Sequence, residues 1–203
     1  MRHRVDAPLW NLFIGYDGVS SSNGVRRRNP ALTFFVWGLF SFCSLPVIFH
    51  FQKEYFAKRE PFFICPIPSQ YNLAHLRSDG YGKGYFGASR RGGRIHQGID
   101  LLSAVGEPVF AAKSGRVLYA GWNNKGYGRY IEIVHPDGLK TIYAHLSKID
   151  IESKFWVRQG ETIGKIGKTG NAKNHNILPH LHFELRNHNK PIDPIPFISY
   201  KIS

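Results

Sequence analysis

Two histidines, His180 and His182, stand two residues apart in a segment that otherwise alternates apolar and polar side chains. Successive side chains of a β-strand point to opposite faces, so the two histidines would share a face with Glu184. The opposite face carries three apolar residues that would pack in a core: Leu181, Phe183 and Leu185. The face with the histidines is therefore available for a functional site. Two imidazoles on one face can share a metal ion, although such a pair alone is more often incidental.

A histidine and a carboxylate occur four residues apart further upstream, at His96 and Asp100. Four is an even step along a strand, so both side chains would share a face with Gly98 between them. Gly98 has no side chain, which lets a ligand or another strand approach the backbone there. Together with a nitrogen of His182, these residues offer three protein ligands. Catalytic zinc sites typically keep their fourth position for water, so the set indicates an open site.

A third segment with a candidate functional histidine spans residues 130–147. Its β-branched first half, the Pro-Asp-Gly sequence at 136–138 and its alternating second half predict a β-hairpin. The alternation puts Thr141, Tyr143 and His145 on one polar face. His145 is therefore expected on an ordered sheet, well placed for a catalytic role.

Four motifs of this chain occur in the order seen in lysostaphin/LytM-type zinc metallopeptidases, and the chain resembles that family over about residues 83–197. They are His96-x-x-x-Asp100, the stretch 143–147 (Tyr-Ala-His-Leu-Ser), the glycine-rich stretch 160–170, and 179–184 (Pro-His-Leu-His-Phe-Glu). Members of the family hydrolyse peptide bonds in bacterial peptidoglycan. The resemblance implies a zinc endopeptidase of cell-wall remodelling with a compact, mainly antiparallel β fold.

Carried over by position, the resemblance implies that His96, Asp100 and His182 bind one Zn²⁺ ion. It also implies that His145 and His180 are the two catalytic histidines that do not bind the metal. Zinc lowers the pKa of bound water to about 7, and a histidine can then orient or deprotonate that water. Which histidine does so is left open. A glutamate base is not supported, because no His-Glu-x-x-His motif is present.

The loop at residues 171–179 is longer than the usual family turn and lacks the glycine that precedes Pro-His in the family pattern. The loop borders the site, so this departure from the family pattern affects the expected substrate preference more than the expected metal binding. His175 within it is predicted to be an exposed loop residue. His135 is predicted to be structural. The remaining histidines belong to no constellation and receive no role: His3, His50, His75 and His188.

Two alternatives stand beside the enzyme. Taken singly, each histidine fits a surface or hydrogen-bonded core position, and Asp100 could cap a turn. Polar groups inside apolar strands are costly to bury without a partner, however, and a metal supplies one. The second alternative is a non-hydrolytic wall-binding or amidase-activating domain on the same fold. Such members typically lack some site residues, whereas this chain has all of them, which favours the enzyme.

The N-terminal part of the chain differs in composition from the part that resembles the peptidases. The resemblance implies that residues 83–203 form the metallopeptidase domain. The composition, with Gly 21, Pro 12 and Phe 15 in 203 residues, separately suits short strands and many turns. Residues 31–50 are mostly apolar and follow three arginines at 26–28, which predicts one transmembrane helix with residues 1–30 cytoplasmic and disordered. The domain would then lie in the periplasm or cell wall. A cleaved signal peptide, giving a secreted protein, is the alternative.

The segment between the predicted membrane helix and the domain gives two further predictions. Residues 51–82 contain several prolines and are predicted to be a semi-rigid spacer. Cys43 and Cys65 are not expected to pair, because Cys43 lies in the predicted span.

The net charge of +13 favours an anionic partner, such as the wall or membrane. No nucleic-acid-binding motif or basic stripe with stacking aromatics is found, so nucleic acid is not expected. The sequence leaves the oligomeric state open.

Overall fold

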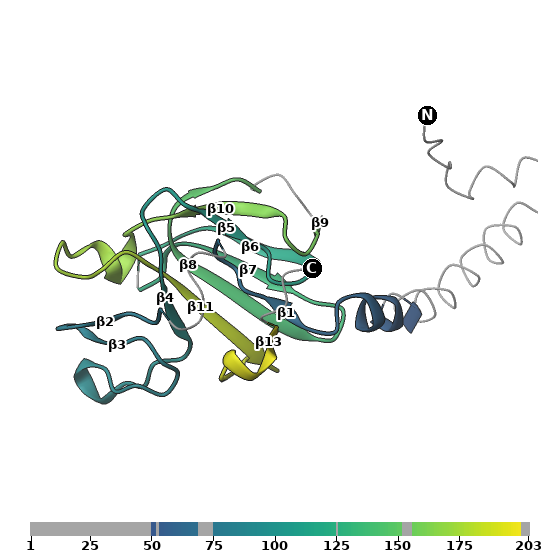
Figure 1. Cartoon of the computed structure of the whole chain (residues 1–203), viewed down its shortest axis with the longest axis horizontal. Coiled ribbons are helices and arrows are strands. Elements are labelled where there is room, and N and C mark those ends of the chain that lie inside the picture. The colour runs from purple at the N-terminus through teal and green to yellow at the C-terminus, as the bar shows by residue number, and fades with distance from the viewer. Residues whose placement is uncertain (1–49, 52, 69–74, 125, 152–155, 200–203) are drawn as a thin grey trace, which may run out of the picture. The chain divides into compact units, whose positions relative to one another are not determined.

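The structure, a computed structural model, describes most of the chain from residue 50 to residue 199 (Figure 1). The described residues are 50–51, 53–68, 75–124, 126–151 and 156–199. They fall in one compact unit, Ser44–Ser203. The predicted disordered segment and nearly all of the predicted membrane span lie outside these residues. Within them, no helix has the length and apolar character that crossing a bilayer requires.

A nine-stranded sheet forms the body of this unit. Six of its strands lie side by side in the order β12–β11–β8–β7–β6–β9, each antiparallel to its neighbours. Their bounds are β6 Gly115–Asn123, β7 Gly128–Val134, β8 Leu139–Ile149, β9 Trp156–Val157, β11 His180–Asn187 and β12 Lys190–Ile192. The prediction of a mainly antiparallel β fold is confirmed, including the hairpin of β7 and β8.

The remaining strands of the sheet join it at its margins. β4 (Ile99–Leu102) pairs with β11, while β10 (Thr162–Ile166) pairs with both β8 and β5 (Pro108–Phe110). Short 3-10 turns lie at η2 Arg91–Gly93, η3 Gly170–Lys173 and η4 Ile195–Phe197, and residues 53–59 are α-helical. The pairing of β4 with β11 matters most for function, because it brings the two predicted metal-binding segments together.

Gly98 lies against β11 immediately before β4 begins. A Cβ atom at this position would come within 2.3 Å of the Phe183 carbonyl oxygen, so no larger residue fits without a shift of backbone. The predicted close approach at Gly98 is therefore confirmed, and the approaching group is a strand. The extended strand predicted over residues 96–100 is shorter than expected, since the strand begins only at Ile99.

Both faces of β11 are buried. Leu181, Phe183 and Leu185 point into the hydrophobic core with at most 1% of their surface exposed, as their alternation predicts. The opposite face differs from the expected open surface, since His180 and His182 are 3% and 8% exposed. The rings of His96 and His145 lie over it, with centroids 5.0 and 5.7 Å from that of His182.

Part of the predicted spacer packs onto the domain. Phe63 and Ile67 belong to the core, and β1 (Phe63–Ile64) pairs in parallel with β13 (Ile198–Ser199). The carboxylate of Glu60 accepts hydrogen bonds from the Ser114 amide and hydroxyl at 2.8 and 2.6 Å. Glu60 and β1 therefore hold this part of the predicted spacer to the domain.

A short hairpin made of β2 (Ser78–Asp79) and β3 (Gly82–Lys83) lies beside β4 (Figure 1). The residue before it, Arg77, donates its backbone amide to the Asp100 carbonyl at 2.8 Å. Asp100 in turn donates its amide to the Gly84 carbonyl at 2.8 Å. Main-chain hydrogen bonds thus fix this hairpin to the strand that carries Asp100, the predicted metal-binding carboxylate.

His135 has the structural role that the sequence predicts. It is buried, its Nδ1 lies 3.0 Å from the Ser114 carbonyl, and its Nε2 lies 2.9 Å from the Thr141 hydroxyl. Burial lowers the pKa of His135 to about 4. The unfolded chain, in which a histidine has a pKa of about 6.5, therefore binds more protons between these two values, so acidification favours unfolding.

We expect His135→Gln to flatten the dependence of stability on pH. In the wild type, this histidine alone should remove about 3 kcal/mol from the free energy of unfolding between pH 7 and pH 4. The measurement is urea denaturation of both proteins across that range. His145 and His180 are unchanged in the variant, so their contributions cancel in the comparison. Equal slopes for the two proteins would contradict the assignment to His135.

Candidate metal centre and active site

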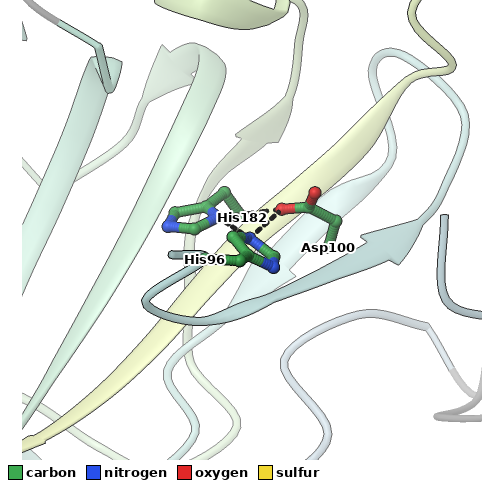
Figure 2. Close-up of side chains that lie close together, drawn as sticks. All are labelled: His96, Asp100 and His182. Atoms are coloured by element: carbon green, nitrogen blue, oxygen red, sulfur yellow. Dashed lines mark hydrogen bonds and ion pairs between the residues drawn. The ribbon is translucent and has the colours of Figure 1, made fainter. Parts of the chain in front are cut away.

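Three side chains from separate segments meet at the junction of β4 and β11 (Figure 2). Asp100 and His182 are direct cross-strand neighbours, and His96 reaches them from the loop that precedes β4. The Asp100 Oδ1 atom lies 3.0 Å from His96 Nε2 and 2.8 Å from His182 Nδ1, and the two nitrogens are 3.0 Å apart. The predicted ligand set is thus brought together, and all three residues are buried.

His96 and His182 each have one ring nitrogen that points away from the cluster. The hydrogen bond of this nitrogen determines which atom of each ring can bind a metal ion. His96 Nδ1 lies 2.8 Å from the Tyr85 carbonyl, and His182 Nε2 lies 2.9 Å from the Glu184 carboxylate. A carbonyl and a carboxylate accept hydrogen bonds, so each of these nitrogens carries the proton. His96 Nε2 and His182 Nδ1 are then the atoms that face the cluster, and a cation can bind there in place of a proton. Two imidazole nitrogens and one carboxylate oxygen suit Zn²⁺, and such outer hydrogen bonds are typical of zinc histidines.

The electrostatics of the site favour a positive charge. Burial alone would lower the pKa of His182, but hydrogen bonds and charges from Asp100 and Glu184 raise it to about 9. Burial likewise opposes ionisation of Asp100, yet the hydrogen bonds from His182 and His96 hold its pKa well below the ordinary value. A metal ion competes with the proton for the same nitrogen, so a pocket that attracts one attracts the other.

The two predicted catalytic histidines lie beside the three ligands. His180 Nδ1 donates to the Leu178 carbonyl at 2.7 Å, and its Nε2 lies 3.8 Å from Asp100 Oδ1. His145 Nδ1 donates to the Thr169 carbonyl at 2.9 Å, and its ring centroid lies 5.1 Å from that of His180. Each histidine therefore keeps an unprotonated Nε2 that can accept a proton.

Burial sets the charge of both histidines that are predicted to be catalytic. It lowers the pKa of His145 to about 3, with a further contribution from the neighbouring His180 and His182. Burial also lowers the pKa of His180 to about 4, although the Asp100 carboxylate opposes this. Both imidazoles are neutral at neutral pH, which is the state that a proton acceptor needs.

His145 reaches the site through an irregularity in β8. Tyr143 pairs with Phe183 on the core side, while Ala144 pairs with His182 on the site side. A regular strand would therefore turn His145 into the core with Thr141 and Tyr143, which are fully buried. Instead His145 has a φ of 66°, and the register of β8 against β7 shifts between Tyr143 and Leu146. The predicted shared face of these three residues is wrong, because this bulge redirects the histidine.

Several charged residues outside the predicted set contact the site. Glu184 accepts hydrogen bonds from His182 and Tyr127 and an ion pair from Arg186. Arg77 and Arg90 both donate to the second oxygen of Asp100. Glu184 was visible as the third polar residue on its strand face. The arginines were not, because nothing in their spacing links them to a carboxylate ten or more residues away.

The loop at 171–179 carries no additional site histidine. His175 is exposed, as predicted, and its carbonyl accepts a hydrogen bond from Lys168. His50, His75 and His188 are exposed as well, while His3 lies outside the described residues. The loop does contact the β2–β3 hairpin, since Asn174 donates to the Tyr81 hydroxyl at 3.2 Å.

Comparison with known proteins places this arrangement among peptidases. The model of peptidase family M23 matches residues 94–194. The chain is 38% identical to glycyl-glycine endopeptidase ALE-1 of Staphylococcus capitis over 124 residues, which cover 59% of this chain and 33% of that protein. It spans about a quarter to a third of the length of such curated relatives.

Crystal structures show the same likeness. The catalytic domain of lysostaphin from Staphylococcus simulans is 34% identical, with a TM-score of 0.50 over 64% of this chain and 97% of that one. A zinc-containing peptidase from Vibrio cholerae is 29% identical, with a TM-score of 0.55 over 66% of this chain and 39% of that one. The fold of this domain is therefore that of the family M23 peptidases.

Proposed function

The chain belongs to peptidase family M23, and we propose that it is a zinc-dependent endopeptidase that hydrolyses peptide bonds in bacterial peptidoglycan. The observation that carries the proposal is the convergence of three atoms that can bind a metal ion, from His96, Asp100 and His182, within 3.0 Å of one another. Two uncharged histidines beside them complete the set that hydrolysis needs. The likeness to a glycyl-glycine endopeptidase and to a zinc-containing peptidase supports the same reaction class.

We assign each residue beside the metal site a separate step in hydrolysis. Zinc in such a site lowers the pKa of water to about 7 and polarises the scissile carbonyl. We assign His180 as the proton acceptor, because its Nε2 is unprotonated and lies 3.8 Å from the Asp100 oxygen that faces the ligand cluster. His145 is placed to orient the water or to stabilise the developing oxyanion, with its ring held by Thr169. The Leu178 carbonyl keeps the proton of His180 on Nδ1.

We further propose that the domain works outside the cytoplasm, where peptidoglycan lies. The apolar run at 31–50 is about as long as a helix needs to cross a bilayer, and the arginines at 26–28 would remain on the cytoplasmic side. An uncleaved anchor would keep the enzyme at the membrane, whereas cleavage would release it. Detection of the full-length or the shortened chain in membrane and soluble fractions distinguishes the two.

The experiment that tests the function uses the full chain and purified sacculi. We expect release of soluble muropeptides, loss of that release on treatment with 1,10-phenanthroline, and its return on addition of Zn²⁺. Mass spectrometry of the products identifies the bond that is cut. Stoichiometric zinc with intact sacculi would overturn the hydrolytic proposal and support a non-hydrolytic wall-binding role.

A further inference from the structure

The β2–β3 hairpin connects the metal-binding carboxylate to the loop that carries the proton acceptor. We propose that Arg77 and Asp79 form a positioning pair that fixes Asp100 for the metal and His180 for proton transfer. The proposal rests on the hydrolytic function above and adds two residues to it. Neither residue touches the reacting atoms, so both would act through the groups they hold.

Arg77 holds the oxygen of Asp100 that faces away from the ligand cluster. Its Nε and one terminal nitrogen donate to Asp100 Oδ2 at 3.1 and 2.9 Å, and Arg90 adds a third donor at 3.0 Å. Asp100 Oδ1 is left for the two histidines. The guanidinium of Arg77 is only 5% exposed and has a planar, fixed geometry, so it sets the rotation of the carboxylate.

Asp79 holds Arg77 on one side and the loop at 174–178 on the other. One carboxylate oxygen accepts from Arg77 at 2.6 Å and from the Tyr81 amide at 2.8 Å. The other oxygen accepts from the Leu178 amide at 3.2 Å. Leu178 then uses its own carbonyl to bind Nδ1 of His180 at 2.7 Å. An unbroken path of hydrogen bonds therefore runs from Asp100 through Arg77, Asp79 and Leu178 to His180.

This path gives the hairpin a defined effect on chemistry. The Leu178 carbonyl determines that His180 carries its proton on Nδ1, and this leaves Nε2 unprotonated. If Leu178 loses its anchor, the carbonyl can move and the imidazole can exchange between its two tautomers. A wrong tautomer cannot accept the proton at the correct atom, so we expect kcat to fall while substrate binding is retained.

The decisive variant is Asp79→Ala, with Asp137→Ala as its matched control. Asp137 has the same kind of partners, a buried lysine at 2.6 Å and a backbone amide two residues ahead at 3.0 Å. Its partners, Lys113 and Leu139, take no part in the site. Removing Asp137 should therefore cost a similar amount of stability without changing the active site. Asp79→Asn keeps one acceptor oxygen and should recover part of what Asp79→Ala loses.

For Asp79→Ala we expect kcat to fall about 10- to 100-fold with KM within about twofold of wild type. The ¹⁵N shifts of the His180 ring should move from a single tautomer toward a mixture. Asp137→Ala should leave kcat, KM and these shifts unchanged. A wild-type kcat and an unchanged His180 spectrum in Asp79→Ala would overturn the role of Asp79.

Arg77 is tested by metal affinity, which does not depend on turnover. We expect Arg77→Met to weaken Zn²⁺ binding about 10- to 100-fold in competition with a chelator, and Arg77→Lys to recover part of the loss. Unchanged zinc affinity in Arg77→Met would overturn its role. If the wild type itself released no muropeptides, the proposed hydrolytic function would be wrong. The zinc affinities of the Arg77 variants and the His180 ¹⁵N shifts of the Asp79 variants would still test whether Arg77 and Asp79 are positioning residues.

Discussion

His182→Ala is expected to lower kcat/KM for peptidoglycan at least about a thousandfold and to remove stoichiometric zinc, because structural support and a metal ligand are lost together. His182 provides one of the three converging ligand atoms. It is also a hydrogen-bond partner of Glu184, whose side chain is only 1% exposed. The variant therefore leaves a buried carboxylate with fewer partners as well as an incomplete site.

Two measurements check this prediction. Zinc content is determined after gel filtration, and muropeptide release is followed with sacculi in excess. The control is His175→Ala, an exposed histidine of the loop at 171–179, which should match the wild type in both assays. His182→Asn tests whether a general loss of folding explains the result, since it retains a polar group at the position. Full zinc occupancy in folded His182→Ala would refute the ligand assignment.

His180→Ala is expected to separate metal binding from catalysis. We expect zinc to remain bound, because His180 Nε2 is 3.8 Å from Asp100 Oδ1 and takes no place among the three ligand atoms. Loss of a proton acceptor typically costs about a hundredfold to ten-thousandfold in rate, so kcat should fall by that amount. KM should change little, since the side chain acts on the water and not on the substrate.

The comparison of the two variants is the informative result. One histidine lies two residues from the other on the same strand, yet only His182 should be needed for zinc. Parallel titration of both proteins with Zn²⁺, followed by assay of each loaded form, provides the data. If His180→Ala lost zinc as completely as His182→Ala, the distinction between ligand and proton acceptor would be wrong.

The part of this site that lies on regular strands can be predicted from sequence. The alternation of β11 places Leu181 and Phe183 in the core and His182 on the other face, as the period of two requires. The glycine between His96 and Asp100 correctly marks the approach of a strand. His96 itself lies in the loop before β4, so its convergence with Asp100 does not follow from the even spacing of a strand.

The parts that could not be predicted depend on irregular or distant contacts. His145 points to the site because its φ is positive and the register of β8 against β7 shifts around it, and a histidine gives no signal for such a bulge. Arg77 lies in the segment predicted to be a spacer, and its partner is 23 residues away. The charge pairing depends on the hairpin fold, which the short β2 and β3 sequences do not reveal.

The attachment at Glu60 and β1 limits how the protein can be dissected. A fragment trimmed to the segment that matches the family, 94–194, would lose Arg77 and Asp79 and both strands of the β1–β13 pair. It would also expose the core surface that Phe63 and Ile67 cover. The smallest autonomous catalytic piece therefore begins no later than Glu60, and a protease that nicks the chain after this residue should impair the enzyme without touching a ligand.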